Sequence, residues 1–327
     1  MKFSKPISFE PIIMERVWGG GRLRDFNKSL PDSEGFYGES WELVDRPEAQ
    51  SVVTGGALGG KKLSELWGDL ETRSAVFGEG APTTQRFPIL VKILDCRQKL
   101  SVQVHPPAEI AESLAGEPKT EMWQIVEADE DASLYVGLKN GASKDDFSSA
   151  VKEGTTEDLI HSIRPSVGES IFIPSGRLHA IGGGLVIYEI QQNSDTTFRV
   201  FDWNRSGLDG KPRQLHVEES LKCIDFDDIE PEMDPQDGES RADCPHFRVD
   251  HWKLAEGESK EAASAGEFAY FGVAEGKVSC GGEVFGKGEF FLVPASREDD
   301  CGKLFSVGAP AEVVRTRFGV AEIGKCA

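Results

Sequence analysis

The stretch GESIFIPSGRLH, residues 168–179, decides the fold. A glycine opens it, a short apolar run follows, and Pro174 and Gly176 form a turn signal. Residues 288–299, GEFFLVPASRED, repeat the same order of glycine, apolar run and proline-containing turn. This repetition predicts two related β units in one chain. The first copy ends in His179 and the second has no histidine there, so a metal ion is expected in the first unit alone.

Short apolar or alternating runs, separated by Gly and Pro, make up most of the remaining chain. This pattern favours a mainly β scaffold with helical insertions, because alternation is typical of strands and the turn residues recur often. Helices are expected at residues 62–77, 108–114, 144–153, 156–163 and 217–221. Strands are expected at residues 89–94, 100–105, 122–127, 133–137, 170–173, 186–191 and 197–201.

An acidic segment divides the chain into two parts. The length of 327 residues predicts about two domains. Residues 226–243 are acidic, contain two prolines and carry few apolar side chains, as is typical of a linker. We therefore expect a larger domain at residues 1–225, which carries the helical insertions and the chemistry, and a smaller β domain at residues 244–327.

The charge balance excludes two classes of partner. With 36 Lys and Arg against 56 Asp and Glu, the formal net charge is −20. Such a chain repels both nucleic acid phosphates and anionic membrane surfaces. An acidic protein that handles an anionic metabolite must instead gather its cations, or a metal ion, at one place.

The sequence also argues for a soluble, cytoplasmic protein. Glu10 and Glu15 interrupt the N-terminal region, so no export signal is visible. The most apolar run, residues 87–94, contains Lys92 and is far shorter than a membrane span of about 20 residues. The six cysteines form no C-x-x-C pair, which argues against a zinc ribbon and favours reduced structural thiols.

Polar side chains of metal-ligand type recur at the predicted strands. In LSVQVH, residues 100–105, the side chains of Ser101, Gln103 and His105 alternate with valines and share one strand face. Taken alone, such a face is most often solvated. Glu121 follows in the run KTEMWQIVE and shares a face with Trp123 and Ile125.

Four of these residues together predict a metal site. His179 follows the Pro174-Ser-Gly176 turn; alone it could be a turn histidine, just as Glu121 could be a strand-end carboxylate in water. Gln103, His105, Glu121 and His179 together offer two nitrogens and two oxygens, the donors expected of zinc or a similar divalent ion. One carboxylate leaves such a site near +1, which suits a developing oxyanion.

These residues, together with other stretches of the chain, resemble those of a known protein family. Residues 168–179 resemble the second cupin motif, and the Gln, His, Glu and His set is similar to that of type I mannose-6-phosphate isomerases, in their short bacterial form. The stretches that agree are VWGGGRL (17–23), GESWEL (38–43), LSVQVHP (100–106), KTEMW (119–123) and YEIQQNSDTTFRVFDWNR (188–205). The resemblance implies two cupin (jelly-roll β-barrel) domains, the second without ligands.

The resemblance also implies an activity and a cofactor. The activity is the interconversion of mannose 6-phosphate and fructose 6-phosphate through a cis-enediol. The cofactor is one Zn²⁺ per chain, held by Gln103, His105, Glu121 and His179. The expected partner is a small sugar phosphate, and the expected protein is a monomer or a weak homo-oligomer.

Further residues receive roles by the same resemblance. Lys119 would assist proton transfer or neutralise substrate charge, Arg199 would lie over the active site, and Asp195 and Glu189 are the other acid/base candidates. Ser101 matches a serine that contacts phosphate, and Arg205 falls where some relatives carry a phosphate-binding lysine.

The sequence departs from the family pattern at two positions, and two other functions would suit a similar scaffold. Ile181 replaces a tyrosine of fungal and animal members, and Pro118 replaces a histidine suggested for ring opening, so the ring-opening group is unassigned. A cupin oxygenase with iron, or a sugar-phosphate sensor without turnover, would use a similar scaffold. The remaining histidines are expected to be structural: His161, on a predicted helix, His216, His246 and His251.

Overall fold

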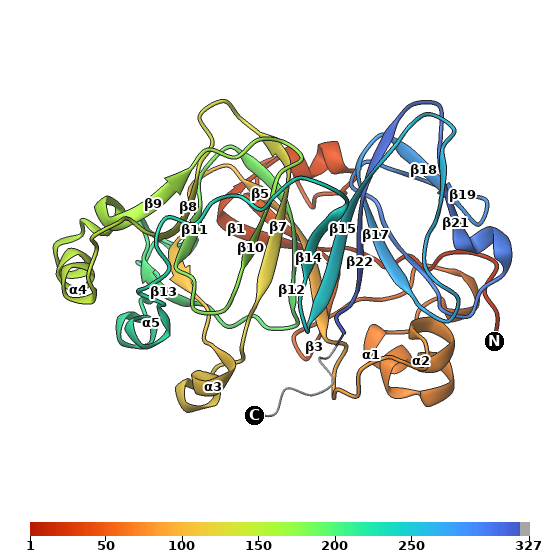
Figure 1. The fold of residues 1–327 in the computed structure, drawn as a ribbon, viewed down its shortest axis with the longest axis horizontal. Coiled ribbons are helices and arrows are strands. Elements are labelled where there is room, and N and C mark those ends of the chain that lie inside the picture. Colours follow the sequence, from red (N-terminus) through yellow and green to blue (C-terminus); the bar gives the residue numbers. More distant parts are fainter. Residues whose placement is uncertain (321–327) are drawn as a thin grey trace.

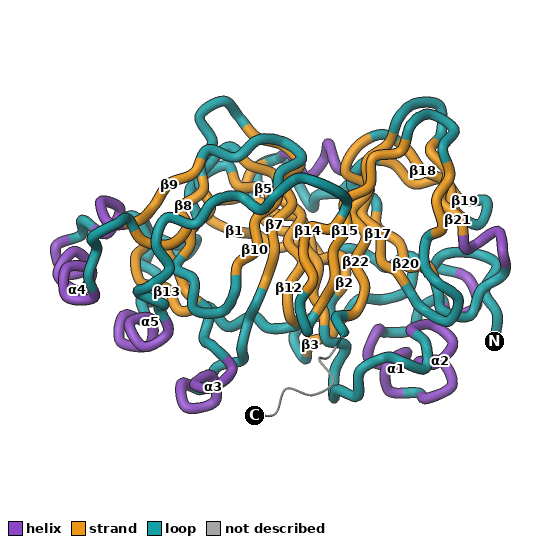
Figure 2. The backbone as a smooth tube through the Cα atoms, in the orientation of Figure 1, coloured by secondary structure: helices purple, strands orange, loops and turns teal. Residues whose placement is uncertain are grey.

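The computed structural model describes residues 1–320 and confirms the mainly β class. Four extended sheets stand side by side and the helices lie at the margins (Figures 1 and 2). Each sheet draws its strands from one side of residue 225, so we call residues 12–201 the first unit and residues 240–318 the second unit.

Two sheets build the first unit. The six-stranded sheet has the order β1 (Ile12–Gly20), β2 (Tyr37–Leu43), β5 (Ile89–Cys96), β12 (Leu185–Gln192), β7 (Glu121–Ala128) and β10 (Ser170–Ile173). The outer five-stranded sheet has the order β13 (Phe198–Phe201), β6 (Val102–Val104), β11 (His179–Ile181), β8 (Leu134–Leu138) and β9 (Ile160–Ile163). All pairings are antiparallel.

Two further sheets build the second unit. One contains β14 (Ser240–Asp243), β15 (Phe247–Leu254), β22 (Ala311–Phe318), β17 (Ala269–Glu275) and β20 (Phe290–Val293). The other contains β16 (Ser259–Glu261), β21 (Lys303–Ser306), β18 (Lys277–Cys280) and β19 (Glu283–Gly286). A short hairpin of β3 (Asp45–Arg46) and β4 (Ala49–Gln50) stands apart.

Buried apolar side chains fill the spaces between these layers. Trp123, Ile171 and Ile181 belong to a cluster between the two sheets of the first unit. A larger cluster, which includes Tyr188 and Phe290, joins the six-stranded sheet to the second unit. The N-terminal segment strengthens this junction, since Ile7 bridges to Leu292 of β20. The six-stranded sheet therefore buries one face against the outer sheet of its own unit. It buries its other face against the second unit.

The helices agree in part with the expectations. They are α1 (Leu63–Gly68), α2 (Leu70–Phe77), α3 (Ala108–Ala111), α4 (Lys144–Glu153) and α5 (Val217–Cys223). The single helix expected at 62–77 is split, because Asp69 is extended and its carboxylate accepts a hydrogen bond from Thr72 N at 2.9 Å, as an N-cap does. No helix within residues 1–320 is long and apolar enough to cross a membrane.

The helix expected at 156–163 is wrong in its second half. Residues Thr156–Leu159 form a 3₁₀ turn, but Ile160–Ile163 is strand β9, paired with β8. Its backbone groups are satisfied by the sheet edge, which a local pattern does not reveal. His161 consequently lies on a strand and not on a helix. At the predicted linker, residues 240–243 form β14 and pair with β15.

Candidate metal centre and cavity

Three predicted residues form a row across the outer five-stranded sheet. Gln103, in the middle of β6, lies directly opposite His179 of β11 on one side and Arg199 of β13 on the other. Side chains at directly opposite positions project from the same face of a sheet. His105 follows β6 and Glu121 begins β7 of the facing sheet. The predicted donors therefore come from two facing sheets, and residues 103–105, 121 and 179 are brought together although they are separated in the sequence.

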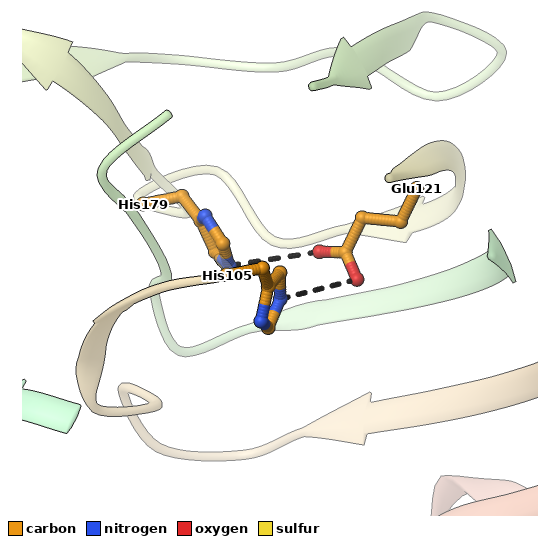
Figure 3. A group of neighbouring side chains, drawn as sticks. All are labelled: His105, Glu121 and His179. Carbon is orange, nitrogen blue, oxygen red and sulfur yellow. Dashed lines mark ion pairs between the residues drawn. The ribbon is translucent and has the colours of Figure 1, made fainter. Parts of the chain in front are cut away.

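His105, Glu121 and His179 face one another in the interior (Figure 3). Nε2 of His105 lies 3.5 Å from Oε2 of Glu121, and Nε2 of His179 lies 3.6 Å from Oε1. The candidate ligand atoms all lie within 4.8 Å of one another, and all three residues are buried. Among residues 1–320 this is the one such group of His, Cys, Asp and Glu side chains.

The hydrogen bonds at the rear of the histidines orient them. Nδ1–H of His105 donates to the carbonyl of Thr196 at 2.8 Å, and Nδ1–H of His179 donates to the carbonyl of Arg177 at 2.9 Å. Each bond leaves an Nε2 lone pair directed at Glu121, the arrangement found in metal-binding histidines. The amide of Gln103 lies 3.2 Å from Nε2 of His179, so it belongs to the same group.

Unpaired buried atoms indicate that a cation fits here. Within the described residues, Nε2 of His105 and Oε1 of Glu121 are buried and make no hydrogen bond. Buried polar groups are normally paired, because leaving one without a partner costs about 1 to 3 kcal/mol. A divalent ion with nitrogen and oxygen ligands would satisfy both atoms. The donor set thus fits the zinc that the sequence predicts.

Lys119 and burial set the charges of this group. Nζ of Lys119 lies 2.8 Å from Oε2 of Glu121. Burial raises the pKa of Glu121, but Lys119 and the histidines outweigh burial, and its pKa lies well below the usual value. Burial, aided by Lys119, lowers the pKa of His105 to about 3, and burial also lowers that of His179. The group therefore holds one carboxylate and two neutral imidazoles, the protonation states that metal binding requires.

A cavity of about 580 Å³ lies next to the buried donors: Gln103 and Lys119 line it, whereas His105, Glu121 and His179 do not. Most of the residues assigned from the sequence line it, namely Ser101, Gln103, Lys119, Glu189, Asp195 and Arg199. A volume of this size accommodates a small metabolite. The structure therefore brings the predicted metal ligands and the predicted acid/base residues to one place.

A chain of charges crosses one wall of the cavity. Lys92 lies directly opposite Glu189, and Nζ of Lys92 is 3.2 Å from Oε1 of Glu189. Arg16 donates two hydrogen bonds of 2.9 Å to Glu39. Burial raises the pKa of Glu39, but Lys92 and Arg16 outweigh it and hold that pKa at about 2. Burial and the nearby Glu121 raise the pKa of Glu189.

Arg199 and Arg213 supply cations on the opposite wall, whereas Arg205 does not line the cavity. Arg205 donates to Asp202 at 3.0 Å, and Arg213 donates to the same carboxylate at 2.7 Å. Burial, and then the nearby Arg213, lower the pKa of Arg199. Of the two arginines that pair with Asp202, Arg213 therefore lies at the cavity, and the phosphate role expected of Arg205 stays a prediction.

Sequence reasoning missed several residues of the cavity. Lys92 carried a readable signal, since it is a single charge within an apolar strand run. Trp18 and Glu39 lie within stretches that carried the resemblance, without a role. His216, expected to be structural, lines the cavity, and its Nδ1 accepts a hydrogen bond from the backbone of Arg199 at 3.3 Å. Only the packing of α5 beside β13 places it there.

Comparisons with known proteins agree with this arrangement. Residues 7–124 match the family model of the phosphomannose isomerase type I catalytic domain. The chain is 36% identical to mannose-6-phosphate isomerase ManA of Bacillus subtilis (strain 168), over 89% of this chain and 93% of that protein. It is also 36% identical to the mannose-6-phosphate isomerase of Streptococcus mutans, over 68% of both chains.

A solved structure shares the fold. The crystal structure of mannose 6-phosphate isomerase from Bacillus subtilis has a TM-score of 0.83 to this chain at 29% sequence identity. The match covers 96% of this chain and 100% of that one. Both β units, and not the first alone, therefore have counterparts in a solved protein.

Proposed function

Since the chain belongs to the type I phosphomannose isomerase family, we propose that it interconverts mannose 6-phosphate and fructose 6-phosphate with one bound zinc ion. One observation carries this proposal beyond the family. The buried, unpaired atoms of His105 and Glu121 adjoin a cavity that is lined by Arg199 and by Lys119, the lysine that contacts Glu121. A metal ligand set, an ammonium and a guanidinium at one cavity suit a phosphorylated sugar.

Gln103, His105, Glu121 and His179 would hold the zinc. When bound, the ion would polarise the sugar carbonyl and hydroxyl oxygens and stabilise the negative charge that develops on them. Lys119 directs an ammonium into the same cavity, so it can donate a proton to, or neutralise, a sugar oxygen. Arg199, Arg213 and the hydroxyl of Ser101 are placed to bind the phosphate.

The proton transfer falls to a carboxylate of the cavity wall. A base removes the proton from C2 of the open-chain aldose, and the electron pair of that C–H bond becomes the C1–C2 double bond of a cis-enediol. The C1 carbonyl oxygen accepts a proton in the same step. Loss of the proton from the C2 hydroxyl and return of a proton to C1 then give the ketose. Glu189 and Asp195 both line the cavity and are the candidates for this base.

The setting of the enzyme belongs to the same proposal. Sugar phosphates and reduced thiols are both typical of the cytoplasm, and the five cysteines within residues 1–320 are all free; Cys326 lies outside the described residues. The division into domains at residues 226–243 and the monomeric or weakly associated state stay predictions.

A coupled assay tests the proposal directly. Formation of fructose 6-phosphate from mannose 6-phosphate is measured on the purified full chain, with its metal content determined before and after chelation. We expect about one zinc per chain, loss of turnover on chelation and recovery when zinc is restored. Zinc without turnover would indicate a sugar-phosphate sensor. Bound iron with oxygen uptake would indicate an oxygenase.

A further inference from the structure

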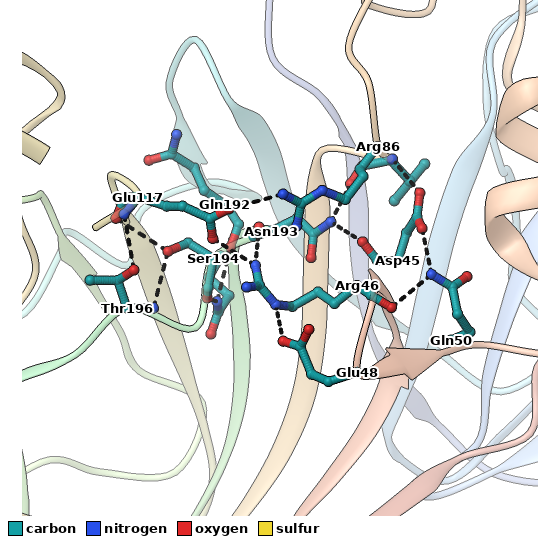
Figure 4. A network of polar contacts seen from close by, with 12 residues as sticks. Asp45, Arg46, Glu48, Gln50, Arg86, Glu117, Gln192, Asn193, Ser194 and Thr196 are labelled. Carbon is teal, nitrogen blue, oxygen red and sulfur yellow. Dashed lines mark hydrogen bonds and ion pairs between the residues drawn. The ribbon is translucent and has the colours of Figure 1, made fainter. Parts of the chain in front are cut away.

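A group of ion pairs lies outside the cavity, where the chain segments that carry the candidate site meet (Figure 4). The carboxylate of Glu117 lies between two guanidinium groups, 2.7 Å from Arg46 and 3.1 Å from Arg86. We call these three residues the Arg46 cluster. None of the three lines the cavity, and Arg86 and Glu117 border a separate pocket of about 290 Å³.

The main chain of Glu117 holds the loop that orients a metal ligand. Its N–H donates to Oγ1 of Thr196 at 2.9 Å, and its carbonyl accepts a hydrogen bond from Oγ of Ser194 at 3.3 Å. The carbonyl of Thr196 in turn accepts the hydrogen bond from Nδ1 of His105. The orientation of His105 therefore depends on where the loop at residues 193–196 lies relative to Glu117.

Arg46 joins the same two segments from the other side. Its Nη1 donates both to Oε2 of Glu117 at 2.7 Å and to the carbonyl of Asn193 at 2.9 Å. Its side chain is only 12% exposed, so solvent screens these bonds weakly. One guanidinium thus fixes the spacing between the segment that leads to Lys119 and Glu121 and the loop that contains Asp195.

We propose that Arg46 and Glu117 are positioning residues for the metal site and act through Thr196 on His105. The inference rests on the proposed zinc-dependent isomerisation, because it assumes that His105 binds the metal. The direct partner of His105 is the carbonyl of Thr196, and replacing a direct partner of a metal ligand typically changes metal affinity or activity about 10- to 100-fold. Arg46 and Glu117 act one contact further out, so this range is the upper limit for them.

A purely structural role is the competing explanation. The Glu117 side chain is 38% exposed and that of Arg86 is 35% exposed, and exposed ion pairs contribute roughly 0 to 1 kcal/mol to stability. A structural role would change the melting temperature but leave zinc affinity and kcat unchanged. The two explanations therefore differ in measurable quantities.

The test compares Arg46→Gln and Glu117→Gln with a matched control, Glu48→Gln. Glu48 also pairs with Arg46, but its side chain is 50% exposed and it makes no hydrogen bond to either segment within the described residues. Zinc affinity of the full chain is measured by competition with a chelating dye, alongside kcat, KM and the melting temperature. Arg46→Lys, which keeps the charge but replaces the planar fork of five donors by a single ammonium, serves as the charge-conserving variant.

We expect zinc affinity to fall by about 10-fold in Arg46→Gln and Glu117→Gln, at the lower end of the range for direct partners of a ligand. It should stay at the wild-type value in Glu48→Gln and recover in part in Arg46→Lys. The value of kcat should fall more than KM rises, because the cluster has no contact with Arg199 or Arg213. The double variant should lose little more than either single one, since both act on the same loop.

Unchanged zinc affinity and kcat in both variants, with or without a lower melting temperature, would overturn the positioning role. Failure of the proposed function can be distinguished from failure of the positioning role. If the wild-type chain binds zinc but does not isomerise mannose 6-phosphate, a drop in zinc affinity in the two variants would still support the positioning role. Equal affinity in all variants would contradict it.

Discussion

The two β units share a strand register but differ in the side chains at the same positions. In the first unit, Ile173 lies opposite Glu121. In the second unit, the matching residue of the repeat, Val293, lies opposite Ala269. A predicted metal ligand in one unit is thus replaced by a methyl group in the other. The fold accepts both, so the register alone does not create the site.

The neighbouring strands of the same two sheets, β12 and β5 in the first unit and β22 and β15 in the second, also carry different side chains at matching positions. In the first unit Glu189 lies opposite Lys92, on the wall of the cavity. In the second unit the corresponding pair is Arg315 and Asp250, with the charges reversed, and Arg315 donates two hydrogen bonds of 2.9 and 2.8 Å to Asp250. Both pairs are ion pairs within the protein, but only the pair of the first unit lines the cavity.

The turn after each repeated strand completes the comparison. His179 of the first unit directs a lone pair at Glu121. The residue at the matching position of the second repeat, Asp299, is exposed and begins the 3₁₀ turn Asp299–Gly302. The comparison teaches that the same strand register carries a buried cluster of His and Glu donors in the first unit, whereas the matching positions of the second unit hold an alanine and an exposed aspartate.

Removing a donor from the first unit should have the largest effect. Glu121→Ala or His105→Ala takes away a predicted zinc ligand, so bound zinc should be lost and turnover should fall by at least about 1,000-fold. Metal analysis and the coupled assay measure both. Full activity in a metal-free variant would remove the distinction between the two units.

Adding the missing carboxylate to the second unit should be the next largest change. Ala269→Glu places a charge in an apolar cluster where Ala269 is fully buried. Without neighbouring donors the charge is uncompensated, and the free energy of unfolding should fall by about 3 to 5 kcal/mol. Chemical denaturation measures the loss. Gain of a second zinc per chain would show that register alone suffices to build a site.

Glu189, which pairs with Lys92 on the cavity wall, should affect the rate of turnover. Glu189→Gln keeps the shape of a candidate base but removes its charge, so kcat should fall by about 100-fold. Zinc content should stay at the wild-type value, because Glu189 is not among the predicted ligands. Turnover at the wild-type rate would leave Asp195 as the candidate base.

The free energy of unfolding should depend on pH through Asp95, which lies three residues beyond Lys92 and is buried. Burial raises its pKa to about 6. The folded state then binds more protons than the unfolded state between about pH 4 and 6, so the free energy of unfolding falls as the pH rises through this window, by at most about 3 kcal/mol.

Asp95→Asn should remove this part of the pH dependence and leave stability at pH 5 less sensitive to pH. Denaturation curves at several pH values measure it. The corresponding residue of the second unit, Lys253, is exposed, so Lys253→Gln is the matched control and should leave the slope unchanged. An unaltered slope in Asp95→Asn would contradict the raised pKa.

The smallest effect is expected from the ion pair of the second unit. Asp250→Asn weakens the bonds to Arg315 and Arg317, which lie 2.8 and 3.1 Å away. The free energy of unfolding should fall by roughly 1 to 2 kcal/mol, while zinc content and kcat stay unchanged. A fall in kcat at constant zinc content would show that the second unit acts on the site.

Much of this molecule could be read from the sequence, because strands and turns leave local patterns. The alternation of residues 100–105 predicted that Gln103 and His105 share a face. In the structure His105 belongs to a buried group with Glu121 and His179, and the amide of Gln103 lies 3.2 Å from His179. The helix expected at 156–163 failed because pairing with β8 decided its second half. That pairing partner is distant in sequence, so no local pattern contains it.

The sequence by itself determined the two β units, the histidine that one repeat has and the other lacks, and the residues predicted to bind the metal. Only the tertiary structure decided that Lys92, Arg213 and His216 share one cavity, and that Arg205 is held by Asp202 outside it. Residue type and spacing specify what a side chain can do. Which side chains meet is set by the packing of sheets that join segments far apart in the chain, where burial and pairing are global properties.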